Sequence, residues 1–484
     1  MALAFFVLGC EKKPALDPAE LRVHYSTEPA TVDPSLAEDG ASLKILGNTA
    51  EGLVGYDGAG KLVPRASSSW TISADGLRYE FLIREGLKWS DGVALRASDF
   101  VTGIQRTINP QSGAKLSELL SSISTVEAPS DQRLVIKLKK KTPYFLKVLS
   151  LPIASPQRQD ILDKNKGAWP VIAPSASSYF IADRKPDQYW ILKKNPFYTA
   201  NSAPDTVKLM VIHEETSAMA LFEQGKLDLL MRVPVLEQPR FQKQGLLSVQ
   251  PFWATFYLGF NVRKKPLDQA AIRCGLARKV NKKELIAVLA SGETVAESWV
   301  PPGMEGYFQE SALPKASASL PSGLQLKAGF DSNPRNSLIM EKIQADWAKS
   351  SAGSPAVALE LFNQDWKSYL RELKLNTPDV FRFGWLAAFA DPISHLQALT
   401  SNNPNNMTGW KSARYDALVE EIAGLEPGNL REKKIVQAQK LLLGEECVVV
   451  PIYHYVQVQG VSSRVKGFAV NGLGIVRFSE ISVK

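Results

Sequence analysis

Strand-like and helix-like segments alternate along the whole of this chain, and this alternation restricts its possible folds more than any other feature. Between residues 77 and 83, and again between 134 and 138, every second residue is apolar, which is the period of a half-buried strand. Apolar residues recur at helical spacing in residues 98–108, 268–289 and 337–349. Because strands and helices interleave, we predict a mixed α/β fold.

The composition is that of a soluble globular protein. Of the 484 residues, 45% are hydrophobic and 22% are charged, which argues against a disordered, collagenous or multi-span membrane protein. The net charge of +8 is a mild bias for a chain of this length. The one dense basic cluster, Lys139 to Lys141, borders a strand-like stretch and is interpreted as a solvated face. We therefore expect no nucleic acid among the partners.

Sequence signatures of catalysis and of metal binding are missing. The three cysteines, at positions 10, 274 and 447, and the four histidines are scattered without the spacing of metal ligands. The segment 55–61 fits the letters of a phosphate loop, but Leu62 stands where a hydroxyl should follow and Pro64 prevents a helix. We expect a protein that is not an enzyme and that holds neither a metal nor another cofactor.

The first ten residues have the pattern of an export signal. Residues 2–8 are apolar, too few to cross a bilayer but enough for the core of a signal peptide. Residues 7–10, Val-Leu-Gly-Cys, resemble a bacterial lipobox, although no basic residue precedes them and a leucine stands two places before the cysteine. The resemblance implies that residues 1–10 are a lipoprotein signal, that Cys10 is lipidated and that residues 11–20 form a tether. A plain hydrophobic terminus is the alternative.

Short motifs, each weak by itself, follow one another in order along residues 21–484. The early ones are Glu28 to Pro34, Glu51 to Val54, Ser69-Trp70, Asp75 to Arg84, Lys88 to Gly92 and Asp99 to Val101. The later ones are Pro143 to Phe145, Leu192 to Tyr198, Phe222 to Asp228, Phe260-Asn261, Pro266 to Asp268, Gly384-Trp385, Asp391-Pro392 and Pro451 to Tyr453. Taken together and in this order, they resemble the oligopeptide/dipeptide-binding receptors of ABC transporters, the bacterial extracellular solute-binding proteins of family 5.

The resemblance implies a two-lobed periplasmic binding protein, type II-like and α/β, with an extra subdomain and a ligand cleft between lobes that close about a hinge. The implied segments are 21–63, 175–262 and 457–484 for the core of lobe I, 64–174 for the extra subdomain, and 263–456 for lobe II. The hinge is expected near residues 260–266 and 455–460.

The function implied is that of a lipid-anchored periplasmic receptor. It binds a peptide or a peptide-like small molecule and delivers it to an ABC permease in the inner membrane, acts as a monomer, and touches the membrane through its lipid anchor only. The alternative is a protein of the same fold that senses a ligand or docks on a partner and is not committed to transport. In an oxidising periplasm Cys274 and Cys447 could pair, and two separate buried thiols are the other interpretation.

The resemblance also places the ligand. An extended peptide must pair its backbone when buried, and exposed strand edges can supply the partners. The positions implied to line the cleft are Glu51, Leu53, Trp366, Arg382, Gly384, Trp385, Leu386, Asn405 and Tyr455. Among them, Arg382 falls where relatives carry an arginine that can meet a ligand carboxylate.

One departure from the family pattern concerns Ala388. Peptide-binding relatives usually place an aspartate three residues after the tryptophan of the Gly-Trp pair, where it pairs with the α-ammonium of the ligand. Leaving such an ammonium buried and unpaired costs about 2–5 kcal/mol. Either Asp391 reaches the ammonium from a rearranged loop, or the ligand has no free amino end. We favour the second explanation. The resemblance also implies that non-peptide ligands are possible, so a sugar, a modified peptide or a metallophore stays open.

Overall fold

The computed structural model describes residues 20–57, 60–199, 203–313, 320–350 and 354–484. The expected signal, Cys10 and the tether up to residue 19 lie outside the described residues. The largest sheet consists of β1 (Glu20–Tyr25), β8 (Tyr179–Lys185), β9 (Tyr189–Lys194), β10 (Thr206–Val211), β11 (Leu229–Leu230), β12 (Leu247–Phe260), β13 (Thr294–Val295), β14 (Gln325–Asp331), β15 (Ala358–Gln364), β16 (Val380–Leu386) and β17 (Val449–Val461). Its order is β15-β14-β16-β12-β17-β11-β1-β10-β9-β8, and β13 pairs with β17.

Three smaller sheets complete the strands that the structure describes. A four-stranded antiparallel sheet has the order β4-β5-β7-β6 and consists of β4 (Ser67–Ile72), β5 (Arg78–Ile83), β6 (Ile123–Ser130) and β7 (Arg133–Leu138). The two remaining pairs are β2 (Val54–Tyr56) with β3 (Leu62–Pro64), and β18 (Val465–Lys466) with β19 (Ser482–Val483).

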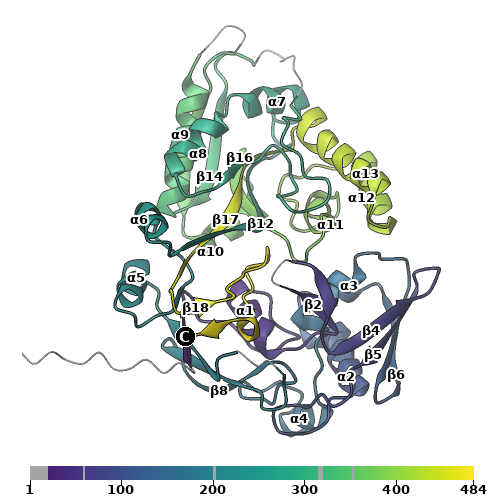
Figure 1. Ribbon diagram of the computed structural model, residues 1–484. Helices are drawn as coiled ribbons and strands as arrows, with labels where there is room; N and C mark the ends of the chain where they lie inside the picture. Colours follow the sequence, from purple (N-terminus) through teal and green to yellow (C-terminus); the bar gives the residue numbers. More distant parts are fainter. Residues whose placement is uncertain (1–19, 58–59, 200–202, 314–319, 351–353) are drawn as a thin grey trace, which may run out of the picture.

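The helices confirm the mixed α/β class (Figure 1). They are α1 (Gly40–Thr49), α2 (Ala97–Ile108), α3 (Phe145–Val148), α4 (Gln159–Lys164), α5 (Glu215–Glu223), α6 (Gln238–Lys243), α7 (Ala270–Arg278), α8 (Lys282–Leu289), α9 (Pro334–Ala348), α10 (Trp366–Leu375), α11 (Ile393–Leu396), α12 (Ala413–Gly424) and α13 (Asn429–Lys440).

Local patterns predicted several elements closely. The predicted strand at 77–83 is β5, in which Tyr79, Phe81 and Ile83 are buried and their neighbours face out. The predicted helix at 98–108 is α2, one residue longer at its start. The region 268–289, predicted as one helical stretch, divides into α7 and α8, because Asn281 caps a new helix by accepting a hydrogen bond from the backbone N–H of Glu284 at 3.1 Å.

Two long antiparallel strands, β12 and β17, join the two lobes of the molecule (Figure 1). Lobe I contains β1 and β8 to β11, and lobe II contains β13 to β16 with α7 to α13. The pairing of β12 with β17 is interrupted between Pro251 and Thr255, so the ladder has one section in each lobe. Each lobe has a hydrophobic core of its own beside these strands.

The interruption is an irregularity in the connection between the lobes. It lies opposite Tyr455, at the edge of the segment 455–460 that was expected to contain the hinge, which stays a prediction. The other expected segment, 260–266, does not coincide with it. Asn261 lies at the far end of β12 inside lobe II, where its side chain donates to the carbonyl of Thr377 at 2.8 Å and its N–H donates to the carbonyl of Asp379 at 2.9 Å.

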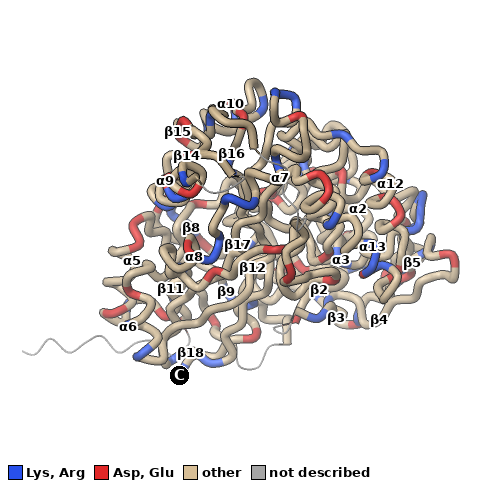
Figure 2. The backbone as a smooth tube through the Cα atoms, turned by 90° about the horizontal axis from the view of Figure 1, so that it is seen from above, with Lys and Arg blue, Asp and Glu red and all other residues tan. Residues whose placement is uncertain are grey.

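The four-stranded sheet forms, with α2, a subdomain that packs against lobe II. Tyr144 stacks on Phe389 with ring centroids 5.3 Å apart. Lys140 and Lys141 each make an ion pair of 2.9 Å with α12 or the residues that follow it, at Glu420 and Glu426 respectively. The basic cluster is solvent-exposed, as predicted, but it also joins two parts of the fold. Figure 2 shows basic and acidic residues interspersed over the molecule.

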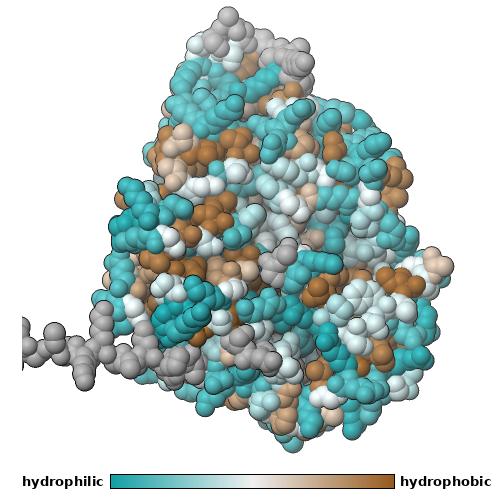
Figure 3. Space-filling model, in the orientation of Figure 1, coloured by the Kyte–Doolittle hydropathy of each residue, from teal (hydrophilic) through white to brown (hydrophobic). Residues whose placement is uncertain are grey.

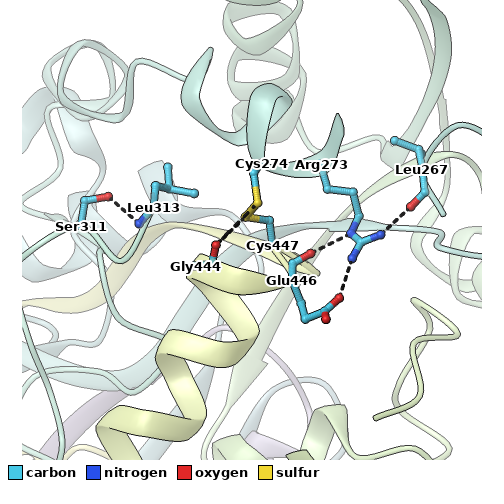
Figure 4. Close-up of a disulfide and its surroundings, with 8 residues drawn as sticks. All are labelled: Leu267, Arg273, Cys274, Ser311, Leu313, Gly444, Glu446 and Cys447. Carbon is cyan, nitrogen blue, oxygen red and sulfur yellow. Dashed lines mark hydrogen bonds and ion pairs between the residues drawn. A yellow bond between two sulfur atoms is a disulfide. The ribbon is translucent and has the colours of Figure 1, made fainter. Parts of the chain in front are cut away.

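Cys274 and Cys447 form a disulfide, with their Cα atoms 5.2 Å apart (Figure 4). The bond links α7 to the chain just before β17, and both residues are buried. Beside it, Arg273 donates hydrogen bonds to the carbonyls of Leu267 and Glu446 at 2.8 and 2.9 Å. Of the two interpretations that the sequence left open, the structure therefore selects pairing.

A membrane-spanning helix is not found in the described part of the chain, where none of the helices combines sufficient length with sufficient hydrophobicity.

Candidate ligand-binding cleft

A cavity of about 570 Å³ lies between the two lobes, and both contribute to its walls. This volume is typical of small-molecule binding sites. From lobe I and the adjoining segments come His24, Asp39, Gly40, Lys44, Glu215, Arg232 and Gln238, among others. From lobe II come Ser291, Glu293 and Arg335, and from the joining strands Phe252 and residues 455–459. Figure 3 shows apolar side chains, in brown, at the level where the joining strands pass from one lobe to the other.

The first turn of α1 and the adjacent β1 form the wall on the side of lobe I. Asp39 caps α1 by accepting from the backbone N–H of Ser42 at 2.9 Å, so the positive end of the helix faces the cavity at Gly40. His24 is 1% exposed and its Nε2 bonds to the carbonyl of Ile212 at 2.9 Å, while its Nδ1 has no partner among the described residues. Burial lowers the pKa of His24, so its ring is neutral.

An arginine and a glutamate form the wall on the side of lobe II. Arg335, at the start of α9, makes an ion pair with Glu293 and donates a hydrogen bond of 3.1 Å to the hydroxyl of Ser291. Its guanidinium lies 5.6 Å from the ring centroid of Tyr453, a cation–π distance. The arginine is therefore held in place before any ligand arrives.

Four of the predicted site residues come together on β16, β17 and α10. The guanidinium of Arg382 lies 5.9 Å from the ring centroid of Trp366. A side chain at Gly384 would place its Cβ 2.9 Å from the hydroxyl of Tyr455, so a larger residue there would displace the Tyr455 side chain. Tyr455 itself lines the cavity, and burial raises the pKa of its hydroxyl. The cluster therefore borders the cavity through Tyr455.

Arg382 is already paired in this structure. Its side chain makes an ion pair of 2.7 Å with Asp331 and is only 12% exposed. It also lies over the ring of Phe256, 5.1 Å from the centroid. The arginine that was expected to meet a ligand carboxylate thus has a carboxylate partner within the protein.

The predicted segment from Glu51 to Leu53 does not line the cavity. Both side chains are buried, at 2% and 0% exposure. The carbonyl of Leu53 accepts hydrogen bonds from the N–H of Arg65 at 3.0 Å and from the hydroxyl of Ser67 at 2.7 Å, so it is not available to a ligand backbone. Sequence reasoning missed the actual wall in the first turn of α1. The Asp39-Gly40 pair before a helical pattern was a signal that could have identified it.

The other predicted positions lie apart from the cavity lining. Trp385 donates from Nε1 to the carbonyl of Ser394 at 2.8 Å, and the side chain of Leu386 is exposed. Asn405 is exposed on the loop before α12, where its N–H donates to the side chain of Asn403 at 2.9 Å. These residues remain predictions as ligand contacts.

Asp391 lies in the protein interior with both carboxylate oxygens occupied. One oxygen accepts from Arg431 at 2.5 Å and from the backbone N–H of Ile393 at 3.0 Å. The other accepts from Lys147, on α3, at 2.7 Å. The side chain is 1% exposed. This geometry favours the interpretation of Asp391 as a structural residue over that of a substitute for the aspartate missing at Ala388.

A cluster of side chains suited to hold a metal ion is not found among the residues that the structure describes. The arrangement that is present combines hydrogen-bonding groups, a helix end and apolar surface in a cavity between two lobes, which can enclose and orient a solute.

Two lobes, two joining strands and a cavity that both lobes line define a solute-binding protein of the periplasmic type. The sequence model of the bacterial extracellular solute-binding proteins, family 5 Middle, matches residues 61–407, so the chain belongs to this family. The resemblance found in the sequence motifs is thereby confirmed, and the family is one of binding proteins and not of enzymes.

Individual relatives match over nearly the whole chain. The oligopeptide-binding protein OppA of Bacillus subtilis (strain 168) is 26% identical, over 97% of this chain and 94% of its own length. The probable deoxycholate-binding periplasmic protein YgiS of Escherichia coli (strain K12) is also 26% identical, over 93% and 90%. The solved structure of the murein tripeptide binding protein MppA of Escherichia coli superposes with a TM-score of 0.81 at 22% identity, over 96% and 98%, and shows the same fold.

Proposed function

We propose that this protein is a periplasmic receptor that encloses a peptide or peptide-like solute between its lobes and delivers it to the permease of an ABC transporter. The observation that carries the proposal is the cavity of about 570 Å³ lined by both lobes. A ligand in such a place contacts both halves at once and stabilises the closed arrangement, which a permease can distinguish from the open one.

The ligand proposed here has no free α-ammonium group. Ala388 offers no carboxylate, and the nearby Asp391 is occupied by Arg431 and Lys147. The relatives named above include one for oligopeptides and one for deoxycholate, a steroid acid that carries a carboxylate and no ammonium. The second name is compatible with a solute that lacks an ammonium group.

Native mass spectrometry of the protein purified from its own cells tests the proposal. We expect a co-purified mass of a few hundred daltons, released on denaturation, whose fragments show amide bonds but no free amino terminus. A permanently empty protein that also fails to bind acetylated and free-amino peptides in titration calorimetry would contradict the proposal.

Anchoring is a separate part of the proposal and rests on the segment Val7 to Cys10. We expect the mature protein to begin at a lipidated Cys10 and to sediment with membranes, because the several acyl chains of a lipoprotein give firm attachment. The Cys10→Ser variant should be released into the soluble periplasmic fraction. An unprocessed and soluble wild type would contradict this expectation.

A further inference from the structure

Lys44 lines the cavity and has no partner for its charge in the described part of the chain. It lies on α1, one turn beyond the helix start, and its side chain is partly buried. Within the described part of the chain, the ammonium of Lys44 takes part in no hydrogen bond or ion pair. The hydrogen bond between Asn48 and Lys44 involves only the backbone carbonyl of Lys44, which accepts from the side-chain amide of Asn48. Burial lowers the pKa of Lys44, and no carboxylate acts against this effect. Burying an unpaired ammonium costs free energy, and a bound anion would offset this cost.

Two carboxylates of the cavity lining make ion pairs with arginines, Glu215 with Arg232 and Glu293 with Arg335. The third, Asp39, caps α1 by accepting from the backbone N–H and the hydroxyl of Ser42, and among the described residues it makes no ion pair with Lys44. Within the ranges that the structure describes, the two arginines of the lining are therefore paired with carboxylates, whereas Lys44 makes no ion pair. Arg382, the residue expected to receive a carboxylate, is compensated by Asp331.

Buried polar atoms beside the cavity also lack partners. His24 is 1% exposed with a free Nδ1, and Gln459 is 2% exposed with a free Oε1 among the described residues. Both residues line the same cavity as Lys44, and Lys44 is close enough to lower the pKa of His24. Buried polar groups are rarely left unsatisfied, so the set indicates a built polar site that a bound solute completes.

We propose that Lys44 binds a carboxylate of the ligand, and that the solute is therefore an anionic, carboxylate-bearing peptide or peptide-like molecule. This inference rests on the proposed function, because it names the chemistry of the solute in the same cavity. The carboxylate can come from a free carboxy terminus or from an acidic side chain. The two sources present the same group to Lys44, so the probes below distinguish them.

Titration calorimetry with matched probes tests the proposal. The first pair is acetyl-trialanine with a free carboxy terminus and its terminal amide. The second pair is acetyl-alanyl-glutamyl-alanine amide and its glutaminyl counterpart. The third pair is glutarate and glutaramide, which carry no peptide features. Each probe is titrated into the wild type, Lys44→Met, Lys44→Arg and Lys164→Met, the last being a control on the exposed face of α4.

We expect the wild type to bind at least one carboxylate probe at least about tenfold more tightly than its neutral counterpart. Lys44→Met should abolish this preference, while Lys44→Arg and Lys164→Met should retain it. The pair that shows the preference identifies the source of the carboxylate. Because the methionine removes an unpaired charge, Lys44→Met should also melt no lower than the wild type. A preference that survives Lys44→Met, or a wild type without any preference, overturns the proposal.

The probes separate this inference from the proposed function. Peptides that bind with equal affinity in charged and neutral form would overturn the role of Lys44 and leave a peptide receptor in place. Glutarate that binds through Lys44, when none of the peptides binds, would support the carboxylate site and contradict the peptide-like ligand.

Discussion

At the scale of single residues, several buried charges are held in ion pairs within the protein. Asp391 illustrates this, since it holds Arg431 and Lys147 together at the junction of the subdomain with lobe II. Arg431 is itself 1% exposed and has Glu305 as a second partner. A buried carboxylate placed in this way holds the structure together whatever the ligand is.

Replacing Asp391 with alanine is expected to lower the free energy of unfolding by about 3–5 kcal/mol, because Arg431 would lose a buried partner. The relative affinity for acetylated and free-amino peptides should stay the same. Thermal melting and calorimetry measure the two effects. The control Asp160→Ala removes an exposed carboxylate from Arg158, which keeps its ion pair with Asp91, and should change stability by less than about 1 kcal/mol. A selective loss of free-amino peptides with unchanged stability would show that Asp391 contacts the ligand.

At the scale of secondary-structure elements, the disulfide fixes the start of β17, one of the two strands that join the lobes, to α7. Closing a loop of this length restricts the unfolded chain, which stabilises a folded protein by about 2–4 kcal/mol. The Cys274→Ala/Cys447→Ala double variant should therefore melt at a lower temperature than the oxidised wild type. Reductant should lower the melting temperature of the wild type only. An equal response of both proteins would mean that the bond does not contribute.

The elements that sequence could predict are those specified by local patterns. Strand β5 follows from alternation, and α2 from helical spacing. Within the site, the family resemblance pointed to Tyr455, which lines the cavity in the structure and stays a prediction as a ligand contact. Glu51 and Leu53 do not line this cavity, and the sequence did not show this because the burial of that segment depends on hydrogen bonds to Ser67 and neighbouring residues. The unpaired state of Lys44 was equally hidden, since it depends on which carboxylates are occupied elsewhere.

At the scale of the whole molecule, the largest hydrophobic core is shared between the subdomain and the helices of lobe II. Two fully buried histidines lie in the interior of lobe II: His395 beside Trp299, and His454, which hydrogen-bonds to Thr255 at 3.0 Å. Burial lowers the pKa of His395 to about 3, assisted by His454. Burial also lowers the pKa of His454 to about 3, assisted by Lys282.

These two histidines predict a loss of stability in acid. Between pH 6.5 and about 3 the unfolded chain binds protons that the folded protein excludes, so the free energy of unfolding falls as the pH falls. The slope is about 1.4 kcal/mol per pH unit for each histidine. Melting curves between pH 7 and 4 should show a shallower slope for His454→Gln than for the wild type and for the exposed control His213→Gln. Equal slopes in all three proteins would contradict the account.

The covalent link between Cys274 and Cys447 has a consequence for a protein that works outside the cytoplasm, where proteases are present. The bond closes a ring that contains most of lobe II. A single backbone cut anywhere between the two cysteines would therefore leave both fragments attached, with β12 and β17 still covalently connected. A nicked protein would migrate as one band without reductant and as two bands with it. Damage of this kind would not by itself separate the two strands that join the lobes.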